Sequence, residues 1–518
     1  MNAAEKKQEA DLSPDVDALE PTARQLASSG KLPEALEKLN ALEKKARNAA
    51  DLTSTTRLLL LSILLIRISP SAKQTDWALL AETLGALARK HGQLKQAVTR
   101  MVQLAMRFLH APGEPDVDEE MGELDPLDEP SEQEKAAKEK DEKKRKAGEE
   151  REIEDKGEGQ LEPRVQKLME EARAVGNEGV DEEQRMKLIE SLRTVTEGKI
   201  FVEVERARVT RLLSSILYSR GDVAGATEAL QELAVETFGS MGRREKTSFI
   251  LEQMRLNLEK GDYTRCNIVS RKINTKFFDD SRNHDLKLTY YALMERYALH
   301  EKKHLDVCRY ARAVLATPRI QRDEARAREV LRSVVVFLVL APYDNEQSDL
   351  MARVEETEGL ERVPEHKNLL KCFTTPELMR WPGIEALYGP LLRATPTFEP
   401  GTDGDYRWEE LHKRVVEHNI RVIAKYYTKI TLQRLSELLD LSPDAAEAAL
   451  AKLVQGGTVY GKIDRPAGVV AFVKRRETAE HLNAWSADMG QLLALVEATS
   501  HLISREHAIS KAGLVAPA

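Results

Sequence analysis

Residues 411–473 read LHKRVVEHNIRVIAKYYTKITLQRLSELLDLSPDAAEAALAKLVQGGTVYGKIDRPAGVVAFV, and they contain the clearest pattern of secondary structure in the chain. Its first part, residues 411–427, repeats apolar side chains at helical spacing in two adjacent rows. One row holds Val416, Ile420 and Ala424, and the other holds Val415, Val422 and Tyr426. A helix with so wide an apolar face must be covered on more than one side, so we expect it inside a packed domain.

Two shorter helices and a β-hairpin are predicted to follow. Ser442 is suited to cap the second helix, with Pro443 at its first position, where the missing N–H costs nothing. A Gly-Gly pair suits the end of that helix. Residues 458–463 and 469–473 are predicted as two short strands around an Asp-Arg-Pro-Ala-Gly turn. Helix, turn, helix and a two-stranded wing together predict a winged helix.

Winged helices often bind DNA, but the second helix here has the wrong charge for that role. A recognition helix needs hydrogen-bond donors on its N-terminal turns. The N-terminal end of this helix carries Asp444 and Glu447, which repel phosphate. The one basic residue of the helix is Lys452, near its far end. The whole chain has a net charge of -8. The basic run Lys474-Arg475-Arg476 beyond the wing keeps DNA binding as an alternative. We favour a protein-contact module and expect no nucleic-acid partner.

The composition indicates a largely helical protein. Over 518 residues, aromatic residues make up 5% and charged residues 32%. The three cysteines (266, 308 and 372) lie far apart without metal-ligand spacing, which favours a reducing compartment. The longest apolar runs, residues 58–66 and 334–341, are shorter than the ~20 residues of a membrane span. With a polar N-terminus that lacks a signal peptide, we expect a soluble intracellular protein without a membrane partner.

A short signature recurs along the chain: Gly, any residue, a bulky apolar residue, two more residues and a small one. Copies begin at Gly30, Gly92, Gly221 and Gly261, and a degenerate copy begins at Lys303. Each lies between two amphipathic segments, as the turn of a helical hairpin does. The last three copies are 40 and 42 residues apart, a period typical of helical solenoids. We therefore predict an all-α helical-repeat solenoid, then a winged helix with a small β-hairpin wing, then a long C-terminal helix.

The predicted organisation has an insertion between two helical parts. Residues 111–160 are acidic, rich in proline at first, and too poor in apolar side chains to offset chain entropy, so we expect disorder. Within them, Lys143-Lys144-Arg145-Lys146 is either a nuclear-import signal or, as we prefer, a solvated charge run. The segments are a disordered N-terminus (1–13), helical hairpins (14–110), the insertion (111–160), the solenoid (161–394), a linker (395–405), the winged-helix part (406–475) and a C-terminal assembly helix with its tail (476–518).

The last helix is predicted from residue 477 to about residue 510. Its apolar residues alternate at spacings of three and four, the pattern of a helix that lies along other helices. The stripe either folds back onto the solenoid or joins an intermolecular bundle, and we favour the bundle because a terminal helix can reach another chain. The predicted interface residues are Leu482, Trp485, Met489, Leu492, Val496 and Ile503, with Thr499 in the same stripe.

One catalytic pattern is present, since residues 300–304 read HEKKH and fit H-E-x-x-H. In metallopeptidases two such histidines on one helix bind zinc and the glutamate activates water. Here the pattern crosses a repeat turn, where a helix should break, and only Glu324 or Glu329 could be a third ligand. An exposed turn is therefore preferred. We interpret His418-Asn419 as a satisfied core pair, and predict no catalytic residue, metal or cofactor.

This architecture resembles the PCI-domain proteins of the proteasome lid, the cullin-deconjugating signalosome and translation initiation factor three. Several runs resemble one lid subunit in particular. The resemblance is strong from about residue 261 to 509 and weaker across residues 14–110, and the insertion departs from its pattern. The runs are SRKINTKFF (270–278), LAPYDNEQSDL (340–350), FTTPELMRW (373–381), RVVEHNIRVIAKYYTKIT (414–431), KIDRPAGVVAF (462–472), and residues 482–485 and 501–506.

The resemblance implies a non-catalytic scaffold of the proteasome lid, which supports assembly and ubiquitin-dependent protein degradation in the cytoplasm and nucleus. Members of the family join side by side through their winged helices, and their terminal helices gather in one bundle. The implied partners are other PCI-type lid subunits, the deubiquitinating lid subunit, the ATPase ring and the core particle. A signalosome or initiation-factor subunit is the alternative within the family. A DNA-binding protein, or a zinc metallopeptidase through His300, Glu301 and His304, would belong to a different class.

Overall fold

A computed structural model describes residues 12–68, 77–110, 163–176, 181–473 and 478–513. The chain divides into two compact units, residues 1–330 and 331–518. The all-α repeat architecture with a winged helix and a long C-terminal helix is confirmed. The predictions for the insertion, for the N-terminus before residue 12, for the basic runs at 143–146 and 474–476 and for the end of the tail lie outside the described residues.

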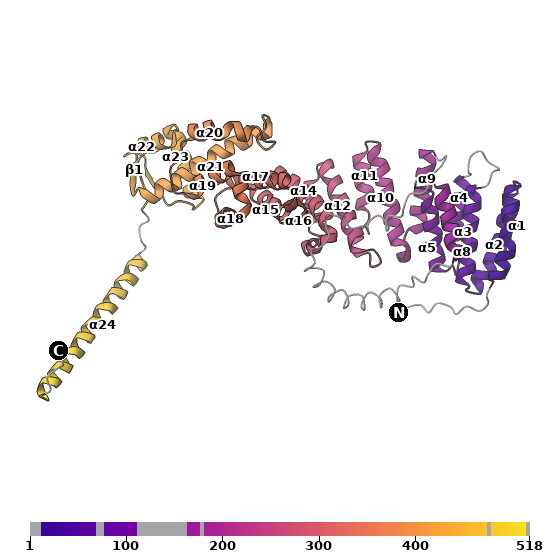
Figure 1. The fold of residues 1–518 in the computed structure, drawn as a ribbon, viewed down its shortest axis with the longest axis horizontal. Coiled ribbons are helices and arrows are strands. Elements are labelled where there is room, and N and C mark those ends of the chain that lie inside the picture. Colours follow the sequence, from indigo (N-terminus) through magenta and orange to yellow (C-terminus); the bar gives the residue numbers. More distant parts are fainter. Residues whose placement is uncertain (1–11, 69–76, 111–162, 177–180, 474–477, 514–518) are drawn as a thin grey trace. The chain divides into compact units, whose positions relative to one another are not determined.

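In the first unit, consecutive helices pack against each other and stack side by side (Figure 1). Helix α17 (Glu324–Leu340) crosses the boundary to the second unit. The elements before it are α1 (Ser13–Ser28), α2 (Leu32–Asn48), α3 (Leu52–Ile68), α4 (Trp77–Arg89), α5 (Lys95–Arg107), α8 (Pro163–Val175), α9 (Glu182–Thr196), η2 (Ile200–Val202), α10 (Glu203–Ser219), α11 (Val223–Gln231), η3 (Val235–Thr237), α12 (Arg243–Lys260), α13 (Tyr263–Ser270), η4 (Thr275–Asp279), η5 (Ser281–Asn283), α14 (His284–His300), α15 (His304–Leu315) and α16 (Pro318–Arg322).

Residues in the left-handed conformation form the turns between paired helices. Gly30, Gly221 and Gly261 have φ angles of 84°, 86° and 84°, which glycine adopts at no steric cost. In each turn the glycine N–H donates to the carbonyl three residues back, and the next N–H donates five residues back. This is the hydrogen bonding that ends a helix in a left-handed cap. The hairpin turns predicted from these glycines are confirmed.

The degenerate copy forms the same turn, but one residue earlier than its predicted start. Lys302 has the left-handed φ of 57°, the N–H of Lys303 donates to Ala298 at 2.9 Å, and helix α15 begins at His304. The predicted alignment from Lys303 is therefore wrong by one residue. A side chain in this conformation costs about 1–2 kcal/mol relative to a right-handed residue, so the turn is strained where the other copies have glycine.

Helix α3 forms the centre of the first core. Its sequence LTSTTRLLLLSILLIRI is apolar on most sides, and residues 58–66 are buried. A helix of this kind must be surrounded by others. Helices α1, α2, α4, α5 and α8 all pack on it. Helix α8, which follows the insertion in sequence, thus closes onto helices that precede it.

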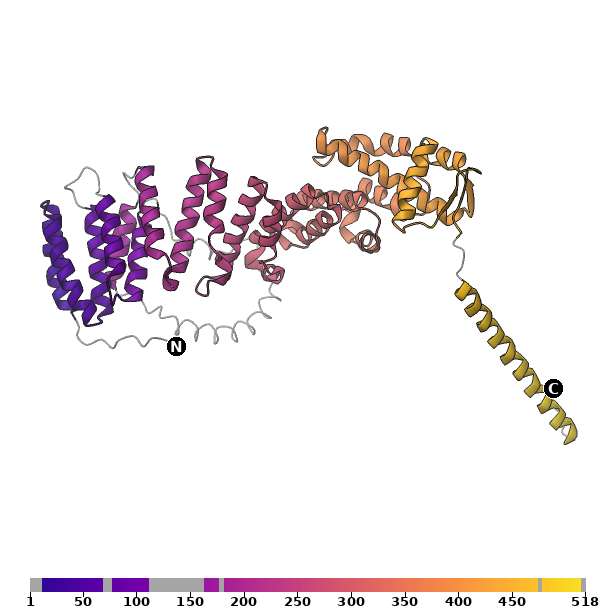
Figure 2. The same cartoon turned by 180° about the vertical axis from the view of Figure 1, so that it is seen from behind.

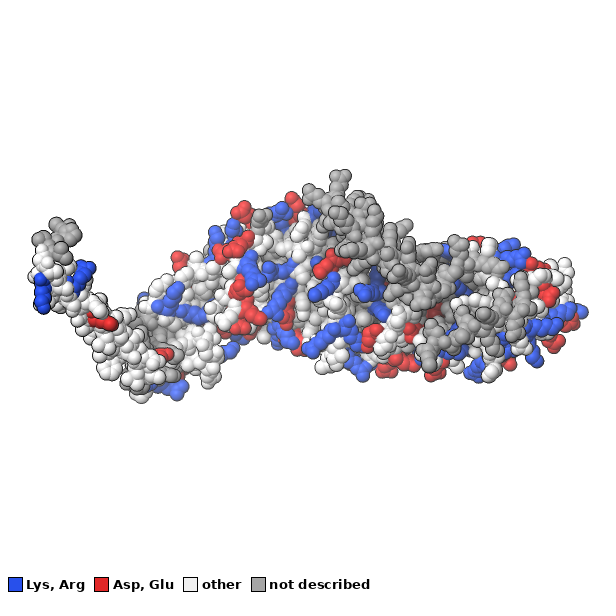
Figure 3. Space-filling model, turned by 90° about the horizontal axis from the view of Figure 1, so that it is seen from below, with Lys and Arg blue, Asp and Glu red and all other residues white. Residues whose placement is uncertain are grey.

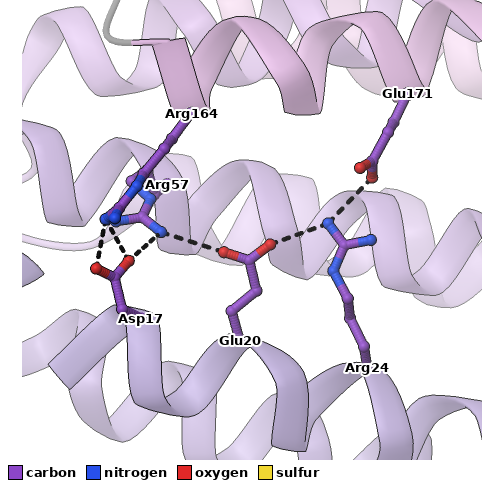
Figure 4. Close-up of polar contacts among 6 residues, drawn as sticks. All are labelled: Asp17, Glu20, Arg24, Arg57, Arg164 and Glu171. Atoms are coloured by element: carbon purple, nitrogen blue, oxygen red, sulfur yellow. Dashed lines mark hydrogen bonds and ion pairs between the residues drawn. The ribbon is translucent and has the colours of Figure 1, made fainter. Parts of the chain in front are cut away.

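Charged side chains also join α8 to α1 and α3 (Figure 4). The guanidinium of Arg57, 3% exposed, donates to Asp17 at 2.8 Å and to Glu20 at 3.1 Å. Hydrogen bonds from Arg57 and then Arg164 lower the pKa of Asp17. Segments 147 residues apart are therefore linked by alternating charges. The six residues are Asp17, Glu20, Arg24, Arg57, Arg164 and Glu171.

The second unit contains the winged helix. After α17 the elements are α18 (Asn345–Glu355), η6 (Glu358–Arg362), α19 (Pro364–Thr374), α20 (Trp381–Arg393), α21 (Thr402–Tyr426), β1 (Lys429–Thr431), α22 (Leu432–Leu439), α23 (Pro443–Gln455), β2 (Lys462–Asp464), β3 (Val469–Ala471) and α24 (Thr478–Lys511). The predicted cap of α23 is confirmed, because the Ser442 hydroxyl accepts from the N–H of Ala445 at 3.3 Å.

The wing is a three-stranded antiparallel sheet in the order β1-β3-β2, drawn as arrows in Figure 2. The predicted two-stranded hairpin is therefore incomplete, since β1 adds a third strand that was not predicted. In the middle row of the sheet, Ile430 pairs with Val470, which pairs with Ile463. These side chains join the apolar core beneath α21, α22 and α23.

Helix α21 begins at Thr402, inside the stretch predicted as a linker. Phe398, in the same stretch, is buried and meets the ring of Trp408 edge-on, with centroids 5.7 Å apart. Arg407 donates to the carbonyl of Thr397 at 2.8 Å. The prediction of a linker over residues 395–405 is therefore wrong. The proline and glycine residues of this stretch form a packed turn, and the buried ring of Phe398 anchors it.

Candidate protein-interaction sites

Helix α24 presents the predicted interface residues on its surface. On the face that Figure 3 shows, this helix is mostly uncharged. Exposed apolar surfaces of this extent mark interaction sites in folded proteins. No helix among the described residues is long and apolar enough to cross a membrane. The exposed fractions are 55% for Leu482, 64% for Trp485, 42% for Met489, 54% for Leu492, 57% for Val496 and 65% for Ile503.

A second apolar row lies beside this stripe. Leu495 and Leu502 are one heptad apart and exposed by 67% and 52%, and Leu493 is also exposed. At 3.6 residues per turn, Leu495 and Leu502 point roughly 100° away from the centre of the stripe. The apolar surface therefore covers more than half of the helix circumference. This row was not predicted, although its seven-residue spacing is visible in the sequence.

The H-E-x-x-H residues do not share a helix. Helix α14 ends at His300, Glu301 and Lys302 form the turn, and α15 begins at His304. The exposed His300 ring stacks on Tyr263 with centroids 3.5 Å apart, whereas His304 is buried. Among the described residues, no three His, Cys, Asp or Glu side chains are grouped to hold a metal. The helix break predicted here is confirmed, so the zinc hypothesis loses its geometric basis.

The two buried thiols are core groups. Desolvation raises the pKa of Cys266 to about 11 and that of Cys308 to about 12. Nucleophilic chemistry needs the thiolate, which such pKa values suppress at neutral pH. Cys266 instead packs with Tyr290 and other apolar side chains. Both residues stabilise the solenoid by packing.

His418 and Asn419 anchor a loop. The Asn419 amide accepts from the N–H of Met379 at 2.9 Å and donates to its carbonyl at 2.6 Å. His418 donates from Nε2 to the carbonyl of Glu377 at 3.2 Å. Burial lowers the pKa of His418 to about 4, so the ring is neutral at physiological pH. The predicted core pair is confirmed.

The N-terminal end of α23 is acidic in three dimensions as well. Asp444 is exposed, and Glu447 forms an ion pair with Arg465 of the wing at 2.7 Å. The one arginine that the wing brings to this helix is thus already paired. A phosphate backbone would meet carboxylates here, which supports protein recognition.

Three family sequence models match the chain. The N-terminal model of PSMD12/CSN4 matches residues 34–129 and 154–323, and the PCI domain model matches residues 367–474. The model of the 26S proteasome regulatory subunit RPN5 C-terminal domain matches residues 480–511, which is nearly all of α24.

Individual relatives show the same pattern of similarity. The 26S proteasome regulatory subunit rpn501 of Schizosaccharomyces pombe is 39% identical over 91% of this chain and 90% of its own length. The 26S proteasome non-ATPase regulatory subunit 12 of Dictyostelium discoideum is 35% identical over 98% and 96%. The COP9 signalosome complex subunit 4 of Emericella nidulans is 24% identical over 60% and 76%.

Proposed function

The chain belongs to the family of 26S proteasome lid subunits that includes RPN5 and non-ATPase regulatory subunit 12, and from this premise we propose that it is a non-catalytic scaffold. It supports ubiquitin-dependent protein degradation by holding other subunits in place. The exposed apolar surface of α24 supports this proposal most directly.

The energetics of α24 favour an intermolecular bundle. Burying an aliphatic side chain completely contributes about 1.5–3 kcal/mol. Because the stripe is half-exposed, covering it with a partner would contribute several kcal/mol of binding free energy. Because the apolar surface covers two sides of the helix, it needs neighbours on both sides. One face of the chain's own solenoid would cover only one of them, whereas a bundle with helices of other subunits covers both.

The proposed partners follow from the family. Other PCI-type lid subunits are expected at α24 and the winged helix, and the ATPase ring, the core particle and the deubiquitinating lid subunit are expected along the solenoid. A proteasome role is favoured over the signalosome, because residues 480–511 match the RPN5 C-terminal domain. The particle is expected in the cytoplasm and nucleus.

Deletion of residues 477–518 tests the proposal. The truncated chain should melt at the same temperature as the full chain, since α24 is exposed, but should fail to enter the lid when the subunits are co-expressed. A truncated chain that aggregates or loses thermal stability would instead show that α24 packs on its own chain. Normal incorporation of the truncated chain would refute the scaffold role of α24.

A further inference from the structure

The wing carries a second surface that is both aromatic and basic. In the sheet register, Ala471 of β3 lies between Lys429 of β1 and Lys462 of β2. The pairing continues beyond the strands, because the N–H of Phe472 donates to the carbonyl of Thr428 at 3.0 Å. On the β2 side, Gly461 lies against Phe472, so the register of both pairs, extended by two residues, places Val473 between Tyr427 and Tyr460. We call Tyr427, Lys429, Tyr460, Lys462 and Val473 the outer wing face.

Strand alternation puts these five side chains on the side of the sheet away from the core. The intervening residues Ile430, Val470 and Phe472 are buried beneath the sheet. Tyr427, Tyr460 and Val473 are exposed by 39%, 45% and 58%. The outer wing face therefore has one apolar row and, next to it, one row with two ammonium groups.

Neither lysine of the outer wing face has a carboxylate partner within the part of the chain that the structure describes. Both are exposed, while the wing arginine at 465 is paired with Glu447. Two exposed cations that form no ion pair, beside a Tyr-Val-Tyr row, make a surface complementary to acidic and apolar side chains together. Charge complementarity of this kind selects partners and speeds their association.

We propose that the outer wing face binds an amphipathic helix of another protein, laid across the strands, with two carboxylates seven residues apart. Adjacent strands are about 4.8 Å apart, so the two lysines, two strands apart, are separated by about 10 Å. Helix positions i and i+7 share a face and are about 10.5 Å apart. Positions on one face of an extended strand are about 7 or 14 Å apart, which does not match.

The second row fixes where the apolar residues of that partner helix lie. The Tyr-Val-Tyr row is two residues along the strands from the lysine row, a distance of about 7 Å. A helix about 10 Å wide covers both rows at once. Its carboxylates then meet Lys429 and Lys462 while a neighbouring apolar stripe covers Val473 and the two tyrosine rings.

A nucleic acid fits this surface less well. Aromatic residues beside lysines on a sheet can stack bases, but Asp464 lies on the same face in the next row of the sheet. Asp444 and Glu447 add negative charge at the N-terminal end of α23. A polyanion would meet these carboxylates, whereas a helix with two acidic positions meets only the lysines. The inference rests on the proposed function, which places the winged helix against other lid subunits, and it does not use the stripe of α24.

Site-specific crosslinking in the assembled particle tests the inference. The full chain, with the photoreactive residue p-benzoylphenylalanine in place of Tyr460, is incorporated into the purified proteasome and irradiated. We expect a crosslink to a helix of another subunit that has two Asp or Glu residues seven apart. The double change Lys429→Glu and Lys462→Glu should lower the yield about tenfold, since two ion pairs become repulsions.

Matched variants distinguish recognition from misfolding. Changing both lysines to arginine should keep the crosslink, and Lys452→Glu, a charge reversal on an exposed position of α23, should leave the yield unchanged. Loss of the crosslink in the arginine variant, or equal loss with Lys452→Glu, would overturn the proposal. So would a crosslink to residues 478–511 of this chain, to a second copy, to nucleic acid or to a segment without the acidic pair. The absence of any crosslink from an incorporated chain would also overturn it, whereas a chain that does not enter the particle would refute the proposed function instead.

Discussion

Replacing Trp485 by alanine should weaken incorporation into the lid by about 100-fold. A buried tryptophan covers about 200 Å², and 64% of this side chain is exposed in the free chain. About 130 Å² is therefore available for burial by a partner, which at ~25 cal/mol per Å² amounts to about 3 kcal/mol. Each 1.4 kcal/mol changes an equilibrium constant about tenfold, which gives the expected factor.

Competition between two tagged chains measures this effect. Wild-type and Trp485→Ala chains with different tags are mixed with the remaining lid subunits, and their ratio in the purified particle is determined. Glu480→Ala is the control, because Glu480 lies on the opposite side of α24 from the stripe. The melting temperature of each isolated chain is recorded alongside. Equal incorporation of both chains, or a drop in the melting temperature of the Trp485 variant, would refute the reasoning.

Lys302→Gly should stabilise the chain by up to about 1 kcal/mol and Gly261→Ala should destabilise it by about 1–2 kcal/mol, because both residues have positive φ. Urea unfolding would measure both changes in the free energy of unfolding, and changes of the same sign would contradict the turn assignment. The free energy of unfolding should fall by up to about 3 kcal/mol between pH 6.5 and 4, because the unfolded chain protonates His418 in this window while the folded chain, with a pKa of about 4, does not. A His418→Gln variant should lose that part of the pH dependence in denaturation experiments, and an unchanged slope would exclude the assignment. Replacing residues 111–160 by a short Gly-Ser linker should shift the melting temperature by less than about 3 °C, because α8 is held by α3 and α5; a larger loss in calorimetry would show that the insertion contributes to the core.

Features controlled by neighbours in the chain were predictable from the sequence. The hairpin turns follow from glycine at left-handed positions, and the cap of α23 from a hydroxyl three residues before an N–H. The stripe of α24 follows from the 3.6-residue period. The break between His300 and His304 follows from the repeat pattern. All of these depend on contacts within a few residues, which a sequence displays directly.

The sequence did not predict what depends on distant partners. Strand β1 has three residues and gains its identity by pairing with β3, about 40 positions later. Phe398 is fixed by Trp408 within a segment whose composition is typical of a linker. The left-handed residue of the degenerate turn is Lys302 and not Lys303, and it lies between the end of α14 at His300 and the start of α15 at His304.

The sites divide in the same way. The exposed stripe of α24 could be identified from spacing, because one helix determines which side chains share a face. The outer wing face could not, since its residues come from three strands and meet only when the sheet forms. Likewise, the hydrogen bond from Arg24 to Glu171 joins residues that are 147 positions apart in the sequence. Local periodicity fixes the faces of single elements, whereas surfaces and charge networks assembled from several elements require the register and packing that only the tertiary structure supplies.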